Sequence, residues 1–342
     1  MRLAVVGATG AVGTVMLERL LARSFPADEV VAFASARSAG RELEGGLVVQ
    51  ELAKEAVRGF DLAIFSAGAS TSREWAPRFA QAGAAVVDNS SAWRMHDDVP
   101  LVVSEVNPGD LVWHDGIVAN PNCSTMQMVV ALKPLHDAAG IERLVVSTYQ
   151  SVSGTGMKAI EELRRQARAV LDGEPLGDPR VYAHPIAFNV LPHAGSFADG
   201  DDHTDEERKL MAETRKILGD DAIRVSATCV RVPVIFGHSE AVNVQTRRPL
   251  EAAEARKLLA AAPGVTVLDD PGSGLYPIAT AAAGRDDVFV GRIRRDPSHD
   301  SALDLWVVSD NIRKGAATNA VQLAELLVER DLLHGRAGTA AA

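Results

Sequence analysis

The stretch Leu3-Ala4-Val5-Val6-Gly7-Ala8-Thr9-Gly10-Ala11-Val12-Gly13 decides the fold that the sequence predicts. Four apolar residues indicate a short buried strand, three glycines follow at every third position, and the apolar pattern of residues 12–22 indicates a helix. Glycines in such a turn let the backbone bend tightly and approach a pyrophosphate, which then lies on the helix N-terminus. Placed directly after the first strand, this turn predicts a dinucleotide-binding domain.

Short apolar runs alternate with helical patterns on either side of this turn. We expect buried strands at residues 3–6, 30–34, 62–65, 84–87 and 117–119, and helices at 12–22 and 72–82. This alternation is typical of a parallel α/β sheet. After Cys123 the apolar segments become longer and often alternate, which predicts a mixed or antiparallel sheet from residues 144–152, 225–234, 241–246, 288–293 and 303–308.

The end of the chain completes the expected domain plan. Residues 316–333 have the spacing of an amphipathic helix that could return to the first domain, and the small, polar tail 335–342 is expected to fray. The predicted class is therefore α/β, with a Rossmann-type dinucleotide-binding domain and a mixed α+β catalytic and dimerisation domain. We expect the first domain at residues 1–120 and 313–342, and the second at 121–312.

Composition limits the function classes. The 342 residues are enough for two cores, and 47% hydrophobic with 23% charged residues describes an ordinary globular protein. A net charge of −10 argues against nucleic-acid binding but leaves room for a local basic pocket that takes a small anion. Two distant cysteines give neither a disulfide framework nor metal-ligand spacing, and no apolar run reaches the ~18 residues of a membrane span. We expect a cytoplasmic protein.

One of the two cysteines is placed for chemistry. The motif Pro121-Asn122-Cys123-Ser124-Thr125 stands where a strand-like run passes into a helical one. The N–H groups and positive dipole end of a helix lower the pKa of a thiol, and the thiolate is the nucleophile. Cys123 is therefore the predicted nucleophile, whereas Cys229 is expected to be a small buried apolar residue. Pro134 lies inside the following helical stretch, so we expect that helix to kink or end there.

The segment after the second strand bears on the choice of dinucleotide. An NAD site usually has an acidic residue there for the ribose hydroxyls, whereas this chain has Arg37 between Ser35 and Ser38. An arginine with two hydroxyls suits a 2′-phosphate, which favours NADP over NAD, although Arg37 in a plain surface turn would face water. Ser66, after another predicted strand, lies at the same sheet edge and could line the cofactor.

Anion-binding and proton-carrying residues are found farther along the chain. Arg231 lies on a predicted strand and His238 follows in a predicted turn, so both should face one cleft. An arginine fork binds a carboxylate, and a histidine exchanges protons near neutral pH. Arg94 offers a second guanidinium behind a strand end. Glu206 and Lys209 are spaced three apart on a helix, where ordinary surface ion pairing is an equal explanation.

Taken together, these motifs resemble the aspartate-semialdehyde dehydrogenase family, in its shorter bacterial branch, over nearly the whole chain. The resemblance rests on several motifs in order: the opening glycine turn, Ser35-Ala36-Arg37-Ser38, Ser90-Ser91-Ala92-Trp93-Arg94-Met95, Pro121 to Thr125, Tyr149-Gln150-Ser151-Val152-Ser153-Gly154, Glu206-Glu207-Arg208-Lys209, Arg231-Val232-Pro233, His238-Ser239 and Asp310 to Ala320. It implies NADPH-dependent, reversible reductive dephosphorylation of L-4-aspartyl phosphate to L-aspartate 4-semialdehyde through a cysteine thioester. This reaction lies on the route to lysine, threonine, methionine and isoleucine.

The resemblance also implies a role for each matching residue. Cys123 would be the nucleophile, His238 the acid/base, Gln150 the residue that orients the acyl group, and Asn122 a donor to the thioester oxygen. Arg231 would bind the substrate α-carboxylate and Glu206 its α-amino group, with Arg94 and Lys209 at the phosphate. The implied NADP contacts are Gly7, Thr9, Gly10, Ala11, Val12, Gly13, Ser35, Arg37, Ser38, Ser66, Ser153, Gly154 and Asn311.

Three other functions compete with this one. N-acetyl-γ-glutamyl-phosphate reductase shares the thiol mechanism but takes an acetylated substrate, so Glu206, suited to a charged amine, favours the aspartate enzyme. A non-catalytic relative would be expected to lack Cys123 or His238, and a nucleotide-sensing module would not need Gln150, Arg231 and Lys209 together. The family also implies at least a homodimer, with small-molecule substrate and inorganic phosphate as the other partners and no metal.

Overall fold

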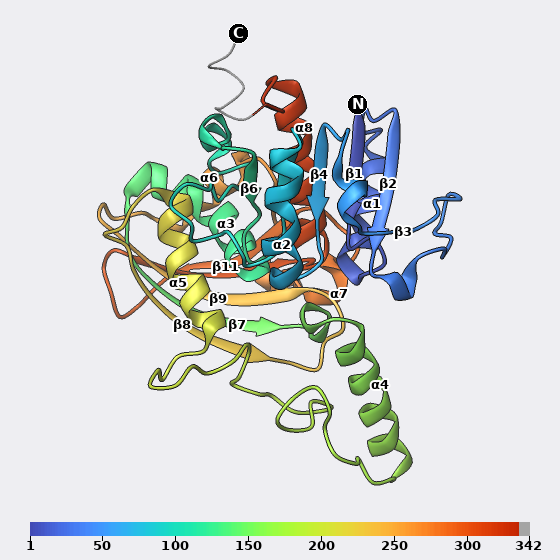
Figure 1. Ribbon diagram of the computed structural model, residues 1–342. Helices are drawn as coiled ribbons and strands as arrows, with labels where there is room; N and C mark the ends of the chain where they lie inside the picture. Colours follow the sequence, from blue (N-terminus) through green and yellow to red (C-terminus); the bar gives the residue numbers. More distant parts are fainter. Residues whose placement is uncertain (335–342) are drawn as a thin grey trace. The chain divides into compact units, whose positions relative to one another are not determined.

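The computed structural model, which describes residues 1–334, divides the chain into two compact units (Figure 1). One unit contains Met1–Asn122 and the chain from Ala316 onward, and the other contains Cys123–Gly315. The expected fraying of 335–342 lies outside the described residues.

The first unit is a parallel six-stranded sheet of order β3-β2-β1-β4-β5-β6. Its strands are β1 (Arg2–Val6), β2 (Glu29–Ala34), β3 (Gln50–Glu51), β4 (Leu62–Phe65), β5 (Ala85–Asp88) and β6 (Ile117–Ala119). Its helices are α1 (Ala11–Ala22), α2 (Ala69–Gln81) and α8 (Asn319–Glu329), with 3-10 turns at Ala36–Ser38, Lys54–Val57 and Pro108–Trp113. The strand order, doubly wound from β1, confirms the predicted Rossmann-type domain.

Alternation along the strands divides the core of this unit between two faces. Leu3 and Val5 belong with Met16 of α1 and Leu323 of α8 to one apolar cluster. On the other face Phe79 of α2 lies edge-on to the ring of Phe65, with centroids 5.4 Å apart. Because successive strand side chains point to opposite faces, a four- or five-residue strand supplies both layers.

The glycine turn between β1 and α1 is packed too closely for side chains. Gly7 has φ +88°, and a Cβ on it would lie 2.3 Å from the carbonyl oxygen of Ser66, at the end of the neighbouring β4. A Cβ on Gly13, in the first turn of α1, would lie 2.1 Å from the carbonyl oxygen of Gly7. Gly10 is looser, with its nearest contact at 3.4 Å, and is the N-cap of α1 without a side-chain cap.

The second unit contains a mixed sheet of order β10-β11-β12-β9-β7-β8, as the alternating segments predict. The strands are β7 (Ile141–Gln150), β8 (Arg224–Arg231), β9 (His238–Thr246), β10 (Val265–Val267), β11 (Val288–Arg295) and β12 (Ala302–Ser309). Pairs β7–β8 and β10–β11 are parallel, and the other three pairs are antiparallel.

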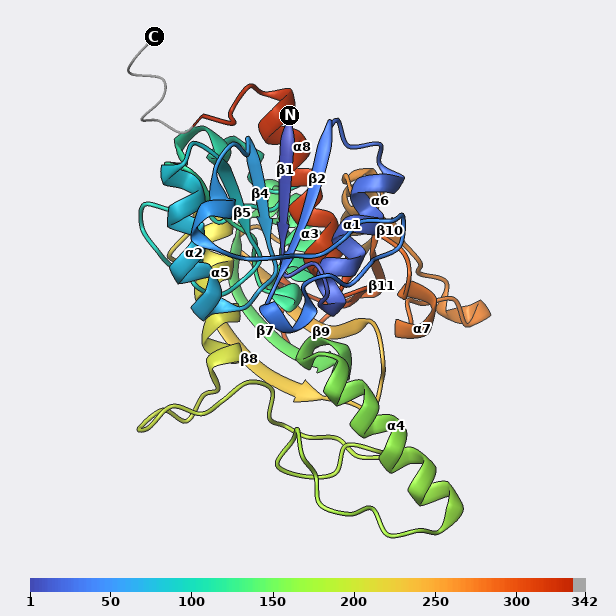
Figure 2. The ribbon, with the colours of Figure 1, turned by 45° about the vertical axis from the view of Figure 1, so that its right-hand side comes forward.

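The helices of this unit differ in burial. They are α3 (Cys123–Ala139), α4 (Met157–Asp172), α5 (Asp205–Leu218), α6 (Ala252–Ala261) and α7 (Ala279–Ala282), with 3-10 turns at Val152–Thr155 and Pro271–Ser273 and a π-helix at Arg313–Thr318. Helix α3 is buried along most of its length and packs on the sheet between α5 and α6. Helix α4 and the segment that follows it extend away from the sheet in both ribbon views (Figures 1 and 2), and the chain returns to β8 where Leu191 pairs with Arg231.

Several predicted boundaries are wrong for identifiable reasons. Strands β7 and β8 end at Gln150 and Arg231 rather than at 152 and 234, because a 3-10 turn follows the first and Pro233 cannot donate to a ladder after the second. Strand β9 begins at His238, which is therefore the first residue of a strand and not part of a turn. The predicted helix 316–333 is a π-helix followed by α8.

Pro134 lies inside α3 and does not end the helix. The helix continues five residues beyond it, to Ala139. An internal proline removes one hydrogen bond of the helix, and the buried apolar face of α3 offsets this cost.

The close packing of the glycine turn gives a stability prediction. We expect Gly13→Ala to lower the free energy of unfolding by about 1–3 kcal/mol, as overpacking does, because the new methyl group meets the backbone of Gly7. Gly10→Ala is the matched control and should cost less, since its Cβ has room. Urea unfolding followed by tryptophan fluorescence measures both variants, and equal midpoints for the two would contradict this packing.

Candidate active site

Cys123 is the first residue of α3, as the sequence predicts. The first N–H groups of a helix have no partner within the helix, so the thiol stands where the backbone favours negative charge. Cys123 is partly exposed, whereas Cys229 is fully buried, and burial raises the pKa of the Cys229 thiol far above its ordinary value. Of the two thiols, only Cys123 has the setting of a nucleophile.

Gly315 lies directly against Cys123. A Cβ built on Gly315 would be 2.9 Å from the Cβ of Cys123. The carbonyl oxygen of Asp310 accepts from the Gly315 N–H at 3.1 Å, and the Asp310 carboxylate accepts from the N–H groups of Ile312 and Gly284. Sequence reasoning included Gly315 in a family motif but gave it no role, because its contact with Cys123 spans nearly 200 residues.

His238 is fully buried and held through one ring nitrogen. Its Nδ1 accepts from the backbone N–H of Ser151 at 3.0 Å and lies 3.1 Å from the Ser151 Oγ. Its Nε2 has no hydrogen-bond partner among the described residues. Burial, reinforced by the charge of Arg231, lowers the pKa of His238 well below its ordinary value. The ring is therefore neutral, with Nε2 available to a ligand.

Arg231 ends β8 next to Gln150, its register partner at the end of β7. One guanidinium nitrogen, Nη1, donates to the carbonyl oxygen of Ser151 at 2.8 Å, while the buried Nε has no partner among residues 1–334. A Cβ on Gly154 would lie 3.4 Å from the same Nη1 and 3.3 Å from Nε2 of His238. Gly154 thus faces the arginine and the histidine together, and an unpaired buried donor at this place suits a carboxylate.

Helix α5 brings Glu206 and Lys209 to Gln150. A capping box begins the helix: Thr204 Oγ1 accepts from the N–H of Glu207, and the Glu207 carboxylate accepts from the N–H of Thr204. The same carboxylate accepts from the backbone of Cys229 in β8, which fixes the N-terminus of α5 to the sheet.

With the helix so fixed, Glu206 points toward the candidate site. Its Oε1 accepts from Nε2 of Gln150 at 3.3 Å, and its Oε2 lies 3.7 Å from Nζ of Lys209. Lys209 also pairs with Asp205 at 2.5 Å. The i, i+3 pair is therefore not an isolated surface pair, since one of its members contacts a buried glutamine.

A short connection links the histidine to the cysteine. Ser309, the last residue of β12, is the register partner of His238, and six residues later Gly315 contacts Cys123. Ser309 Oγ also donates to Gln127, one turn after Cys123 in α3. Within the second unit, residues 309–315 therefore join the ends of β9 and α3.

Glu240, two residues after His238 on the same face of β9, is fully buried and was not predicted. Burial raises the pKa of its carboxyl well above the usual range, and the neighbouring Gln127 offsets only part of this effect. Burial therefore favours the neutral form of this carboxyl group.

The first unit contains the residues predicted for NADP. Arg37 and Ser35 are exposed at the carboxyl end of β2, and Arg37 makes no hydrogen bond or ion pair with a described residue. The N–H groups of Gly7 and Ala8 donate to Phe33 in β2, so this end of β2 lies beside the glycine turn. A cradle that a Cβ would fill, an uncapped helix start and an unpaired arginine fit a dinucleotide with a 2′-phosphate.

Arg94 is buried in the first unit, and its guanidinium donates hydrogen bonds to backbone carbonyl groups. Its Nε donates to the carbonyl oxygen of Asn120 at 3.0 Å, and its NH2 to that of Asn89 at 3.0 Å. Asn122, also buried, is the residue before Cys123. The structure therefore gives Arg94 a positioning contact at the end of β6, and its binding of phosphate stays a prediction.

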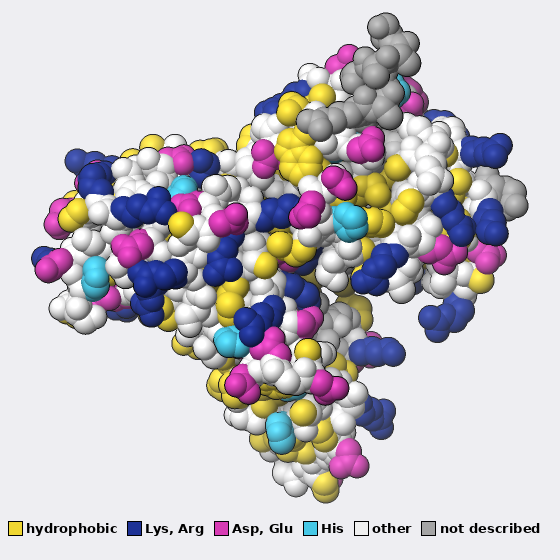
Figure 3. All heavy atoms as spheres, turned by 60° about the vertical axis from the view of Figure 1, so that its left-hand side comes forward, with side chains coloured by type: hydrophobic (Ala, Val, Ile, Leu, Met, Phe, Trp, Pro, Cys, Tyr) yellow, Lys and Arg dark blue, Asp and Glu magenta, His cyan; other side chains and the backbone are white. Residues whose placement is uncertain are grey.

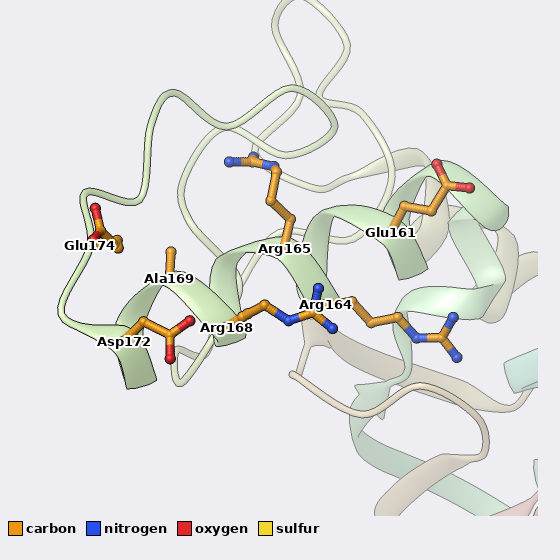
Figure 4. A pocket seen from close by; sticks show the side chains of 7 residues that line it. All are labelled: Glu161, Arg164, Arg165, Arg168, Ala169, Asp172 and Glu174. Atoms are coloured by element: carbon orange, nitrogen blue, oxygen red, sulfur yellow. The ribbon is translucent and has the colours of Figure 1, made fainter.

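One hollow of the surface contains none of the residues predicted for the site. A hollow on α4 is lined by Glu161, Arg164, Arg165, Arg168, Ala169, Asp172 and Glu174 (Figure 4). Basic and acidic side chains are interspersed over the face in Figure 3. Among the helices of residues 1–334, none is long and apolar enough to cross a membrane.

Comparison with known proteins agrees with this architecture. Residues 2–114 match the family model of the semialdehyde dehydrogenase NAD binding domain, and residues 132–314 that of the semialdehyde dehydrogenase dimerisation domain. Aspartate-semialdehyde dehydrogenase of Aquifex aeolicus (strain VF5) is 55% identical over 338 residues, which cover 97% of this chain and 99% of the relative.

Solved structures are similar over the same extent. Aspartate semialdehyde dehydrogenase II of Vibrio cholerae complexed with ASA is 47% identical with a TM-score of 0.91, covering 96% of this chain and 98% of that one. Aspartate semialdehyde dehydrogenase with NADP from Candida albicans is 28% identical with a TM-score of 0.73, covering 97% and 99%.

The glycine-turn sheet is that of an NAD(P)-dependent dehydrogenase. In the second unit, His238 and Arg231 both face Gly154, and Cys123 begins α3. The chain belongs to the aspartate-semialdehyde dehydrogenase family, which confirms the resemblance seen in the sequence.

The contact between Gly315 and Cys123 gives a prediction about turnover. We expect Gly315→Ala to lower kcat about 100-fold, because the added methyl group displaces the Cys123 side chain and misplacing a nucleophile by about 1 Å costs this much. Gly109→Ala, at a glycine with open space around it, is the control. Steady-state kinetics and the rate of Cys123 alkylation measure the effect, and a wild-type kcat would refute the role of this contact.

Proposed function

We propose that this protein catalyses the reversible NADP-dependent conversion of L-aspartate 4-semialdehyde and inorganic phosphate to L-4-aspartyl phosphate. The observation that carries the proposal is the cluster of Gln150, Arg231 and His238 in the unit that begins with Cys123. The relatives and solved structures named above, aspartate-semialdehyde dehydrogenases, support it.

In the proposed mechanism, Cys123 and His238 carry the covalent step. The neutral His238 takes the Cys123 thiol proton at Nε2, and the thiolate adds to the aldehyde carbon. A C–S bond forms, and the carbonyl electrons move to oxygen, which takes that proton from the imidazolium. As this carbon is oxidised to the thioester, the proton returns to the histidine. Phosphate oxygen then attacks the acyl carbon, the C–S bond breaks, and Cys123 leaves as the thiolate.

The remaining side chains bind and orient the substrate. Arg231, with a buried unpaired Nε, would bind the α-carboxylate, and Glu206 the α-ammonium group. Gln150, bonded to Glu206, would orient the acyl group, and Asn122 would donate to its oxygen. Lys209 and Arg94 would bind the phosphate.

NADP would lie on the first unit. The turn from Gly7 to Gly13 and the start of α1 would hold the pyrophosphate, with Arg37, Ser35 and Ser38 at the 2′-phosphate and Ser66 beside the turn. Ser153, Gly154 and Asn311 are further predicted contacts. When bound, the nicotinamide accepts or supplies the hydride of the reaction.

The oligomeric state and the cellular location of the protein can also be proposed. Residues 132–314 match a dimerisation domain, and we infer that the protein is at least a homodimer that pairs through the second unit. The cysteine chemistry requires a reduced thiol, which supports a place in the cytoplasm.

The alternative enzyme, N-acetyl-γ-glutamyl-phosphate reductase, has less support. Its substrate has an acetamide where aspartate semialdehyde has an ammonium group, so Glu206 would face a neutral group. The relatives named above are aspartate-semialdehyde dehydrogenases.

A paired substrate assay tests the proposal. Purified protein should reduce NADP⁺ with L-aspartate 4-semialdehyde only when phosphate is present, and should be far slower with N-acetyl-L-glutamate 5-semialdehyde. Absorbance at ~340 nm follows the nicotinamide. Cys123→Ser should lose activity by orders of magnitude yet still bind NADPH, because a hydroxyl is a far weaker nucleophile than a thiolate. Activity with the acetylated substrate alone would overturn the assignment, and an active serine variant would overturn the covalent mechanism.

Arg37 should set the cofactor preference. We expect Arg37→Glu to raise the KM for NADP about 10- to 100-fold and to change that for NAD little, since a hydrogen bond to a charged group contributes about 1.5–3 kcal/mol. Arg41→Glu places the same charge at another exposed arginine four residues on and should leave the preference unchanged. Equal losses with both cofactors would mean that Arg37 does not contact the 2′-phosphate.

A further inference from the structure

Two buried polar side chains of α4 hold the segment 180–191, which follows this helix. Glu162 and Gln166 lie four residues apart, so they share one face of α4, and both are buried. One carboxylate oxygen of Glu162 accepts from the backbone N–H groups of residues 180 and 181 at 2.7 and 3.1 Å. The side-chain oxygen of Gln166 accepts from those of residues 186 and 187 at 2.8 and 3.2 Å. The segment is therefore fixed to the helix at two places.

A small apolar core joins the same segment to α4 and to the turn after β7. Ile186 and Leu191 belong to this core together with apolar residues of α4 and with Val152, the first residue of the 3-10 turn. Tyr182 packs against it and is partly buried. Leu191 then pairs with Arg231, at the end of β8, through two backbone hydrogen bonds of 2.8 and 2.9 Å. The segment thus runs from α4 to the arginine of the candidate site.

Tyr182 lies over the arginine that is predicted to bind the substrate carboxylate. The guanidinium carbon of Arg231 is 6.0 Å from the centre of the Tyr182 ring. The phenol hydroxyl donates to Thr155 Oγ1 at 3.1 Å, which connects the ring to the turn that contains Gly154. Burial raises the pKa of Tyr182 above its ordinary value, so the phenol is neutral and its ring face can attract a cation.

A ring in this position affects the guanidinium in two ways. Arg231 is only 6% exposed, and the ring helps to keep water from it, which strengthens the pairing of the guanidinium with a carboxylate. The ring also restricts the orientation of the planar guanidinium, whose Nη1 is already bonded to the carbonyl oxygen of Ser151. The buried Nε, which has no partner within residues 1–334, is then oriented in advance for a carboxylate.

We propose that Tyr182 is a positioning residue for substrate binding, whose ring orients Arg231 and excludes water from it, and that α4 holds this ring through Glu162 and Gln166. The inference deepens the proposed function, because it rests on Arg231 as the residue that binds the α-carboxylate. It makes the segment 180–191 part of the substrate pocket. The ring sets the affinity for the substrate and leaves proton and hydride transfer to other groups.

Steady-state kinetics test the role of the ring. Tyr182→Leu should raise the KM for L-aspartate 4-semialdehyde about 3- to 10-fold, as loss of a partly desolvated cation–π contact does, and should change kcat and the KM for NADP less than about twofold. Tyr182→Phe keeps the ring and should restore most of the wild-type KM. Tyr276→Leu removes another tyrosine of the second unit, one that is 44% exposed, and is the control. A wild-type KM in Tyr182→Leu would overturn the proposal.

A binding measurement separates this proposal from the proposed function. Calorimetry on Cys123→Ala, which cannot form the thiohemiacetal, gives the dissociation constant for L-aspartate 4-semialdehyde without turnover. Adding Tyr182→Leu to this variant should raise that constant about 3- to 10-fold. The same constant with and without the ring would refute the role of Tyr182. Failure of Cys123→Ala to bind the aldehyde at all would instead contradict the proposed function.

Variants of α4 test how the ring is held. Glu162→Ala removes the acceptor of two backbone N–H groups and should raise the KM for L-aspartate 4-semialdehyde as far as Tyr182→Leu does. The double variant should be no worse than the poorer single one, because both changes act on the position of one ring. Glu161→Ala, at the adjacent but exposed glutamate of α4, should leave this KM unchanged. Multiplicative losses in the double variant, or an equal loss in Glu161→Ala, would show that α4 does not act through Tyr182.

Discussion

The approach of Gly315 to the Cβ of Cys123 is the contact on which the rest of the candidate site depends. A Cβ added to Gly315 would lie 2.9 Å from the Cβ of Cys123, so a larger residue does not fit there without a shift. The helix that begins at Cys123 and the connection that ends at Gly315 are thereby fixed to each other. This connection starts at Ser309, the register partner of His238, so it joins the start of β9 to the start of α3. Asp310 holds the five residues between Ser309 and Gly315, because its carboxylate accepts from the backbone N–H groups of Ile312 and Gly284.

Burial determines which side chains of the second unit carry a charge. His238 and Glu240 stand two residues apart on one face of β9, both fully buried, and burial moves their pKa values in opposite directions. Each is therefore neutral, and Arg231 remains as a buried positive charge with an unsatisfied donor. A protein of net charge −10 can attract an anionic substrate only where its own carboxylates are uncharged or already paired. Glu240 meets the first condition, and Glu206, next to Lys209, meets the second.

Local sequence signals predicted much of the fold and part of the site. The glycine turn, the parallel strands and the start of α3 at Cys123 follow from short patterns, because each depends on residues adjacent in the chain. The position of His238 was wrong by one element, since a strand that starts immediately after Gly237 has no local signal of its own. Ser151 and Glu240 were given no role of their own, because their partners come from β9, α3 and the end of β12. Such long-range contacts leave no spacing pattern in a single sequence.

The arrangement around Glu206 explains how the same chemistry could be limited to one substrate. Gln150 and Lys209 already partner its carboxylate, so the free enzyme does not leave a bare charge at the rim of the site. A substrate ammonium would add a third, positively charged partner without displacing the glutamine. An acetamide would contribute no charge and would need space next to Gln150, which is almost fully buried. A charged hydrogen-bond acceptor strongly rejects an analogue that lacks the matching donor, whereas an apolar pocket rejects an added methylene group only weakly. Discrimination between the two substrates therefore rests on the Glu206 carboxylate rather than on pocket volume.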